Sequence, residues 1–156
     1  MKGHPKIIEM LNRILTGELT GVNQYFIHSR MCRNWGYQRL AKHSWEESIG
    51  EMKHADELIE RILFLEGVPN MQRYNKIRVG ETVPEQLSLD RDLEVEAVAL
   101  LNEAVELAVA VHDNGSRDLV EKILRSEEEH LDWLESQLEL IRQIGEQNYL
   151  AQQIRE

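Results

Sequence analysis

Two short motifs in this chain pair a carboxylate with an imidazole at helical spacing. Glu51 and His54 frame the first motif, and Glu127 and His130 frame the second, in the other half of the chain. Residues three apart lie on one face of an α-helix, so each motif presents both side chains to the same point. Such oxygen and nitrogen donors suit a divalent transition metal. A single Glu-x-x-His is a weak signal, because glutamate is frequent in this chain.

The separation between the two motifs recurs elsewhere in the chain. The same offset separates Glu18 from Glu94, and each of these precedes its own Glu-x-x-His motif by the same distance in sequence. Apolar positions repeat with this offset too: Val22 and Val98, Leu58 and Leu134, Ile62 and Leu138, Leu65 and Ile141. Acids alone could match by chance, as Glu9 and Glu85 do near two helix starts, but the matching apolar positions favour an internal repeat. We infer two similar helical hairpins, each with a lone glutamate on one helix and a Glu-x-x-His on the next.

These acids and histidines predict a site for two metal ions. Carboxylates inside a helical bundle lose hydration and repel one another, so most would hold protons unless cations balance them. Two divalent cations balance four carboxylates, and two neutral imidazoles complete the donor set. A set without thiolate favours iron or manganese, with zinc as a competitor. The alternative, that these side chains are merely solvated or salt-bridged, fits the paired pattern less well. The predicted metal ligands and catalytic residues are Glu18, Glu51, His54, Glu94, Glu127 and His130.

Roles within this set follow from the helix that carries each side chain. Glu51 and Glu127 are the candidate bridging ligands, because each shares its helix with a histidine ligand. Glu18 and Glu94 are then terminal ligands. Tyr25 lies about two turns after Glu18 on the same face, where it would act as a hydrogen-bond or one-electron donor, or equally as an ordinary core tyrosine. Three other histidines show no recognisable ligand spacing: His28, His43 and His112.

Helical periodicity predicts the elements that would position these residues. Expected helices cover about 5–35, 37–65, 83–112 and 116–144, with a short fifth at 147–154. Residues 67–82 lack periodicity and are too many for a tight helical hairpin, which favours a crossover connection. No strand pattern competes. The prediction is an all-α four-helix bundle, with a long crossover loop and a short C-terminal fifth helix, forming a single domain over residues 1–156.

Composition narrows the classes of function. The formal charge of −10 argues against nucleic acid and anionic membrane surfaces as partners, and favours metal cations. The apolar stretch from Val95 to Val111 contains three glutamates, so we expect no membrane span. Cys32 is the only cysteine, which excludes an internal disulfide and suits a reducing compartment. With no apolar signal core near Met1, the expected location is the cytoplasm.

Several stretches together resemble the bacterioferritins, nearly from one end of the chain to the other. The resemblance is carried by Met1–Gly3, Asn23–Phe26, Glu51–Asp56, Arg61–Gly67, Ser116–Asp118, Asp132–Glu135 and Asn148–Leu150. The six proposed ligands also match the ferritin-like pattern of one glutamate from each of two helices and Glu-x-x-His from each of the other two. Met52 inside the Glu-Met-Lys-His motif distinguishes this family from haem-free ferritins. By position alone, Met52 points about 100° away from Glu51 and would be core or interface filler.

The resemblance implies a ferritin-like bundle that assembles into a hollow 24-subunit cage. It implies a ferroxidase, an Fe²⁺:oxygen oxidoreductase, that uses O₂ or H₂O₂ at a di-iron centre and stores a ferric mineral. It further implies a b-type haem between two-fold related subunits, with Met52 of each as an axial ligand. Electrons for iron release would reach this haem from a bacterioferritin-associated ferredoxin. Asn34, Glu66 and Asp132 match residues that line the family's lesser pores.

Three positions depart from the family pattern. Glu46 and Gly50 stand where the family often has a histidine and an aspartate on its inner surface, which puts an inner-surface iron relay in question. Trp45 replaces a common tyrosine near the subunit interface. These differences leave open a cage made of this chain alone or mixed with a second subunit type. Two other functions also remain: a non-catalytic structural subunit, and a ferritin-like peroxidase without mineral storage.

Overall fold

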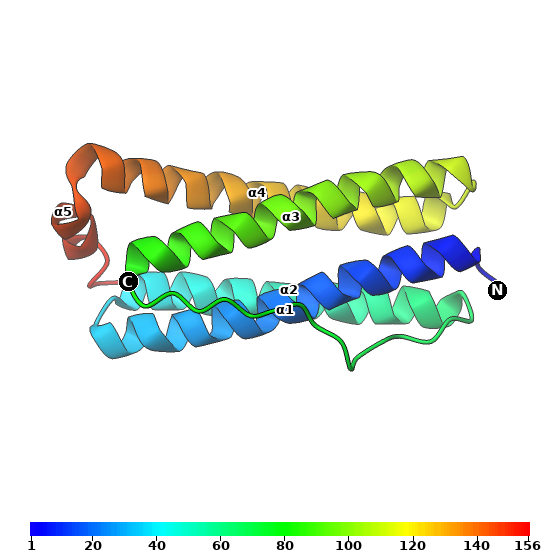
Figure 1. Ribbon diagram of the computed structural model, residues 1–156, viewed down its shortest axis with the longest axis horizontal. Coiled ribbons are helices and arrows are strands. Elements are labelled where there is room, and N and C mark those ends of the chain that lie inside the picture. The colour runs from blue at the N-terminus through cyan, green and yellow to red at the C-terminus, as the bar shows by residue number, and fades with distance from the viewer.

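Four long helices lie side by side in the computed structural model, which describes all 156 residues (Figure 1). Helix is the only regular secondary structure, so the predicted all-α bundle, with its crossover loop and short C-terminal helix, is confirmed. No helix is both long enough and apolar enough to cross a membrane. The helices are α1 (Pro5–Trp35), α2 (Gln38–Phe64), α3 (Val83–Ala110), α4 (Asn114–Ile144) and α5 (Glu146–Ala151).

Side chains at the helix starts satisfy backbone N–H groups that have no partner within the helix. His4 caps α1, where its Nδ1 accepts a hydrogen bond from the Lys6 N–H at 3.1 Å. Thr82 caps α3 by accepting from the Glu85 N–H at 3.3 Å. The Glu85 carboxylate in turn accepts from the Glu81 N–H at 3.1 Å. Residues 82–85 therefore start α3 much as the capping-box pattern in the sequence indicates.

The fourth and fifth helices differ from their expected ranges. Asp113 is the cap of α4, because its carboxylate accepts a hydrogen bond from the Ser116 N–H at 3.0 Å. Helix α4 therefore begins at Asn114, slightly before the expected start. Helix α5 ends at Ala151, before the expected end at 154. Gly145, with φ of 85°, separates α4 from α5.

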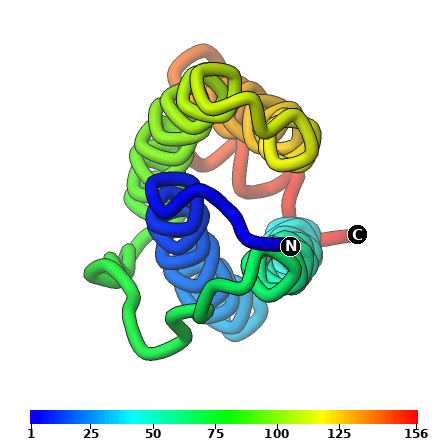
Figure 2. Tube along the Cα trace, turned by 90° about the vertical axis from the view of Figure 1, so that its right-hand side faces the viewer, coloured from blue at the N-terminus to red at the C-terminus, as the bar shows by residue number.

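The crossover between α2 and α3 runs the length of the bundle beside α1 (Figures 1 and 2). Polar side chains on one face of α1 form hydrogen bonds with the backbone of the crossover. Asn12 donates to the Val68 carbonyl at 3.1 Å, and the N–H groups of Asn75, Arg78 and Gly80 donate to Thr20, Gln24 and His28. The crossover therefore brings the start of α3 back to the end of the bundle where α2 begins.

The apolar core is divided into two clusters. The larger lies mainly between α1, α2, α3 and α4 and includes Leu15, Leu58 and Leu101. The smaller includes Leu40, Leu134 and Tyr149, so α5 seals that end of the bundle. Between the clusters the interior contains buried acids and histidines rather than hydrocarbon. Such a polar layer is costly to bury unless its groups are paired or bind metals.

Candidate metal centre

The six sequence-predicted ligands converge in the middle of the bundle, and all six are buried. One comes from α1, one from α3, and two each from α2 and α4. Ligand atoms of Glu18, Glu51, His54 and Glu127 lie within 4.8 Å of one another. Those of Glu94, Glu127 and His130 form a second group with the same spacing. Glu127 belongs to both groups and Glu51 to only one, so Glu127 has the clearer bridging position.

Each Glu-x-x-His histidine contacts carboxylates from other helices. His54 Nδ1 lies 3.1 Å from Glu127 Oε1 and 3.5 Å from Glu18 Oε2. His130 Nδ1 lies 3.1 Å from Glu94 Oε1. The two histidines therefore occupy similar settings in the two halves of the bundle. This agrees with the internal repeat in the sequence.

Two carboxylate oxygens in this centre have no hydrogen-bond partner. They are Glu18 Oε2 and Glu94 Oε2, one from each half of the site, and both are buried. A buried acceptor without a donor is costly, because it has lost water and gained nothing. A cation at each position would satisfy these oxygens. The donor set and its orphaned atoms therefore fit a pair of divalent metal ions.

Burial also changes the protonation of these groups in the metal-free protein. Burial raises the pKa of Glu18 and of Glu127, and raises the pKa of Glu94 to about 8. For His54, burial lowers the pKa, but the hydrogen bonds and charges of Glu127 and Glu18 outweigh it, and the pKa rises to about 10. Protons therefore neutralise the centre where cations are absent.

The backbone of α1 comes unusually close to this centre at Gly21. A Cβ added there would lie 3.2 Å from both Cγ and Oε2 of Glu51. A Cβ at Gly17, one turn earlier, would meet nothing within 4 Å. Gly21 therefore makes room for the Glu51 side chain, whereas Gly17 has no such role.

Tyr25 lies beside the second group of ligands. Its hydroxyl donates a hydrogen bond to Glu94 Oε1, and its ring meets the His130 ring edge-on at 5.1 Å between centroids. Burial raises the pKa of the Tyr25 phenol well above its ordinary value, so the hydroxyl keeps its proton. The structure thus places Tyr25 where it can orient a proposed ligand.

Met52 lies outside the buried centre. Its side chain is 52% exposed, whereas all six proposed metal ligands are buried. Two aromatic side chains on α1 and α2, Phe26 and Trp45, are also exposed and pack together at 5.6 Å between ring centroids. Met52 is therefore available to a neighbouring molecule rather than to the buried ligands.

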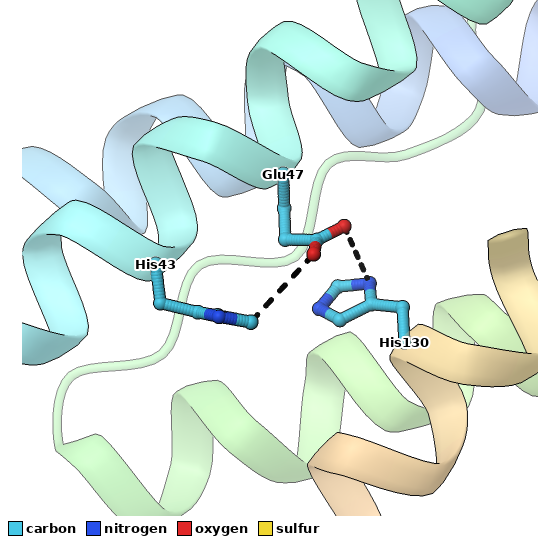
Figure 3. A group of neighbouring side chains, drawn as sticks. All are labelled: His43, Glu47 and His130. Carbon is cyan, nitrogen blue, oxygen red and sulfur yellow. Dashed lines mark ion pairs between the residues drawn. The ribbon is translucent and has the colours of Figure 1, made fainter.

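One neighbour of the centre was not predicted from the sequence. His43, which shows no ligand spacing along the chain, lies with Glu47 beside His130 (Figure 3). His43 and Glu47 are four residues apart on α2 and so share a helix face. This i, i+4 spacing was the only feature of the sequence that could have indicated the group. The third member, His130, lies on α4, and spacing along the chain cannot show that two helices bring such residues together.

The amino-acid sequence of this chain is similar to those of known ferritin-like proteins along nearly its whole length. Residues 8–144 match the model of the ferritin-like domain of the ferritin family. The chain is 45% identical to a bacterioferritin of Mycobacterium tuberculosis, over 97% of this chain and 96% of that protein. It is 46% identical to a bacterioferritin of Streptomyces coelicolor, over 97% and 90%, and 48% identical to one of Brucella melitensis, over 96% and 92%. With this similarity along its whole length and the buried carboxylate–histidine centre, the chain belongs to the bacterioferritins of the ferritin family.

Proposed function

We propose that this protein stores iron and acts as a ferroxidase in iron homeostasis. The observation that carries the proposal is the buried centre, in which two ligand groups share Glu127 and each half leaves one carboxylate oxygen without a partner. Glu18, Glu51, His54, Glu94, Glu127 and His130 are the proposed ligands of two iron ions. Two Fe²⁺ bring four positive charges to four carboxylates, so loading replaces the protons that the metal-free centre holds.

Fe²⁺ is the substrate of the proposed reaction. Two Fe²⁺ give up two electrons together, which with two protons convert O₂ to H₂O₂, or H₂O₂ to two waters. Delivering both electrons at one centre avoids one-electron reduction of oxygen. The residues contribute charge balance, geometry and proton acceptors, while Tyr25 holds Glu94 in place through its hydrogen bond. The Fe³⁺ product would pass to a ferric mineral inside a cage of 24 subunits, formed by this chain alone or with a second subunit type.

Haem binding is a further part of the proposal. Met52 supplies a soft, neutral thioether on the exposed side of α2, which suits a haem iron. Two copies of Met52 across a two-fold axis would hold one b-type haem between subunits. When bound, the haem would accept electrons, as from a bacterioferritin-associated ferredoxin, and allow stored iron to be reduced and released. We place this activity in the cytoplasm, where thiols such as Cys32 stay reduced.

Replacing terminal ligands tests the ferroxidase assignment. Glu18→Ala and Glu94→Ala should each slow Fe²⁺ oxidation by about tenfold or more, because each removes one metal ligand while leaving the apolar clusters intact. Stopped-flow oxidation of Fe²⁺ under O₂ or H₂O₂, with oxidant consumption, gives the rates. Gel filtration checks that the cage still assembles. Glu103→Ala is the matched control, since Glu103 lies on α3 but at the surface.

The same measurements separate the alternatives. Wild-type rates in both ligand variants would refute the di-iron assignment. A structural subunit would bind Fe²⁺ without consuming oxidant. A peroxidase without storage would consume H₂O₂ but retain no ferric iron after gel filtration. Retained iron with oxidant consumption, both lost on removal of Glu18 or Glu94, is the result expected here.

A further inference from the structure

A second set of metal-type donors lies just outside the buried centre. His43 and Glu47 come from α2, and His130 comes from α4 (Figure 3). One donor atom from each lies within 4.8 Å of the others. The three also border one small cavity between these helices. His43 and Glu47 belong to neither group of proposed iron ligands.

The spacing within this set is close to that of a bound metal. Glu47 Oε2 lies 3.3 Å from His130 Nδ1, and Glu47 Oε1 lies 3.9 Å from His43 Nε2. Donors about 2.1 Å from a tetrahedral metal are separated by about 3.4 Å. Small side-chain movements would therefore bring all three onto one ion. Two imidazoles and one carboxylate, with positions left for water, form a donor set used for Fe²⁺ and Zn²⁺.

His43 is held in position and yet lacks a partner. Its ring stacks on Trp133 of α4, with 3.4 Å between ring centroids and 14° between planes. Its Nε2 is buried without any hydrogen-bond partner, although Glu47 is the nearest acid. Stacking fixes the ring, and burial makes an empty ring nitrogen costly. A metal ion between His43 and Glu47 would remove that cost.

We propose that His43, Glu47 and His130 form a third metal site that takes Fe²⁺ or another divalent first-row cation next to the buried pair. The side chains of His43 and Glu47 are 23% and 29% exposed, so the site connects the buried centre with solvent. Glu46 and Glu129 act on Glu47 as nearby negative charges, which favours a cation there. The inference of a metal site depends only on the geometry of these three residues, and only its link to iron oxidation rests on the proposed function.

The shared histidine couples the third site to the pair. His130 Nδ1 faces both Glu47 Oε2 and Glu94 Oε1, at 3.3 and 3.1 Å, so it can bind one ion at a time. An outer ion must therefore compete with an inner one for this nitrogen. When the pair is full, the outer ion keeps His43, Glu47 and water, and binds more weakly. The outer position is suited to hold an ion that is about to enter or leave the centre.

Zn²⁺ is a redox-inert probe for this site. Crystals of the assembled protein soaked in Zn²⁺ should show anomalous density about 2.0–2.2 Å from His43 Nε2 and from a Glu47 oxygen. His43→Phe keeps an aromatic ring against Trp133 but removes the nitrogen, and should abolish this density. Glu47→Gln should do the same or weaken binding about tenfold or more in anaerobic Co²⁺ titrations followed by visible absorption. Glu60→Gln, an exposed change farther along α2, should leave the ion in place.

Two results would overturn the third site. One is wild-type protein with Zn²⁺ at the buried pair but none at His43 and Glu47. The other is His43→Phe protein that retains the outer ion. Either result leaves the ferroxidase proposal standing, because Glu18, Glu51 and Glu94 are unchanged. Loss of density from the buried pair, with the outer ion present, would instead contradict the proposed function.

Discussion

Within the buried centre, both an acid and a histidine have raised pKa values when no metal is present. Burial raises the pKa of Glu94 to about 8, and the carboxylates of Glu127 and Glu18 raise the pKa of His54 to about 10 in spite of its burial. At neutral pH both groups therefore carry a proton in the metal-free protein. A divalent cation needs a carboxylate and a neutral imidazole as ligands, so it must displace these protons.

Metal loading should therefore release protons and strengthen with pH. We expect Zn²⁺ or anaerobic Fe²⁺ binding at pH 7 to release one or more protons per subunit, and the affinity to rise between about pH 7 and 10 as Glu94 and then His54 lose their protons. Calorimetry in buffers of different ionisation enthalpy measures the release. Glu103→Gln, at the surface of α3, should match wild type. Binding heats that do not depend on the buffer would show that the ligands have already lost their protons before the metal binds.

Single residues differ in how far the sequence could predict them. The six buried donors follow from spacing, because Glu-x-x-His and its repeat at a constant offset are properties of one chain read along its length. His43 could not be predicted as part of a site from its spacing, because its neighbours Trp133 and His130 lie on another helix. Long-range partners of this kind depend on how α2 packs on α4. The sequence periodicity predicts the face that packs but not the neighbours it meets.

At the scale of helices, α1 and α2 pack so closely at Gly21 that a side chain there would press against Glu51. Gly21→Ala should weaken metal binding, because its Cβ would lie 3.2 Å from Glu51 Cγ and Oε2 and displace that carboxylate. We expect a loss of affinity of about tenfold, similar to other disturbed ligand orientations. Zn²⁺ calorimetry measures it.

Gly17→Ala provides the comparison on the same helix, where an added Cβ meets nothing within 4 Å. It should bind metal as wild type does and stabilise α1 by about 1 kcal/mol through helix propensity. Equal metal affinities in the two alanine variants would contradict the account of Gly21.

The turn between α3 and α4 is joined to α2 through Asp113. Its carboxylate caps α4 and accepts a hydrogen bond from Arg61 Nη2 at 2.9 Å. Although burial opposes it, these hydrogen bonds from Ser116 and Arg61 lower the pKa of Asp113 below its ordinary 3.8. The ionised form is therefore the one that the fold stabilises.

Asp113→Asn should lower the free energy of unfolding by about 1–2 kcal/mol at pH 7. A carboxylate with a lowered pKa adds stability above its unfolded pKa and loses it as pH falls through the folded pKa. The difference from wild type should therefore shrink below about pH 4. Thermal unfolding of the metal-free protein across this range measures it, with Asp118→Asn, an exposed change near the start of α4, as control. A difference that is constant with pH would exclude ionisation as its source.

The presence of the four long helices was predictable, because the spacing of apolar residues extends over many turns. The paths of the connections between them were not. The crossover has no periodicity, and its path is fixed by Asn12, Thr20, Gln24 and His28 of α1. In the sequence these polar residues are indistinguishable from a solvated face. The start of α4 also differs from its predicted position, because the Asp113 carboxylate accepts from the Ser116 N–H and caps the helix before Asn114.

The whole molecule carries a net negative charge, and three apolar side chains on α1 and α2 are exposed. Phe26 packs against Trp45, and Met52 follows Trp45 by about two helical turns on α2. The formal charge is −10, and these three side chains are 46%, 41% and 52% exposed. Apolar side chains grouped on such a surface are typical of an interface. In a two-fold dimer, one patch meets its own copy, so Met52 of one subunit would face Met52 of the other. This arrangement would place two thioethers on either side of one haem iron.

Met52→Leu should therefore abolish haem binding while the cage still assembles, because leucine fills similar space without a ligand atom. The buried centre is untouched, so the first phase of Fe²⁺ oxidation should match wild type. Reductive iron release should be slower. Haem per subunit by absorption spectroscopy, cage size by gel filtration and iron release under a reductant measure these effects. Met71→Leu changes an equally exposed methionine in the crossover, 51% accessible, and should retain haem.

The outcomes of this test separate a ligand from an interface side chain. If Met52 serves only to pack two subunits, Met52→Leu protein will purify with six-coordinate haem at the wild-type ratio, because leucine packs as well as methionine. If Met52 is the ligand, Met52→Leu removes both thioethers at once, and the haem is lost even though the dimer persists. Loss of haem together with loss of the dimer is resolved by Met52→His, which restores a ligand at the same position and should recover six-coordinate haem with a shifted spectrum.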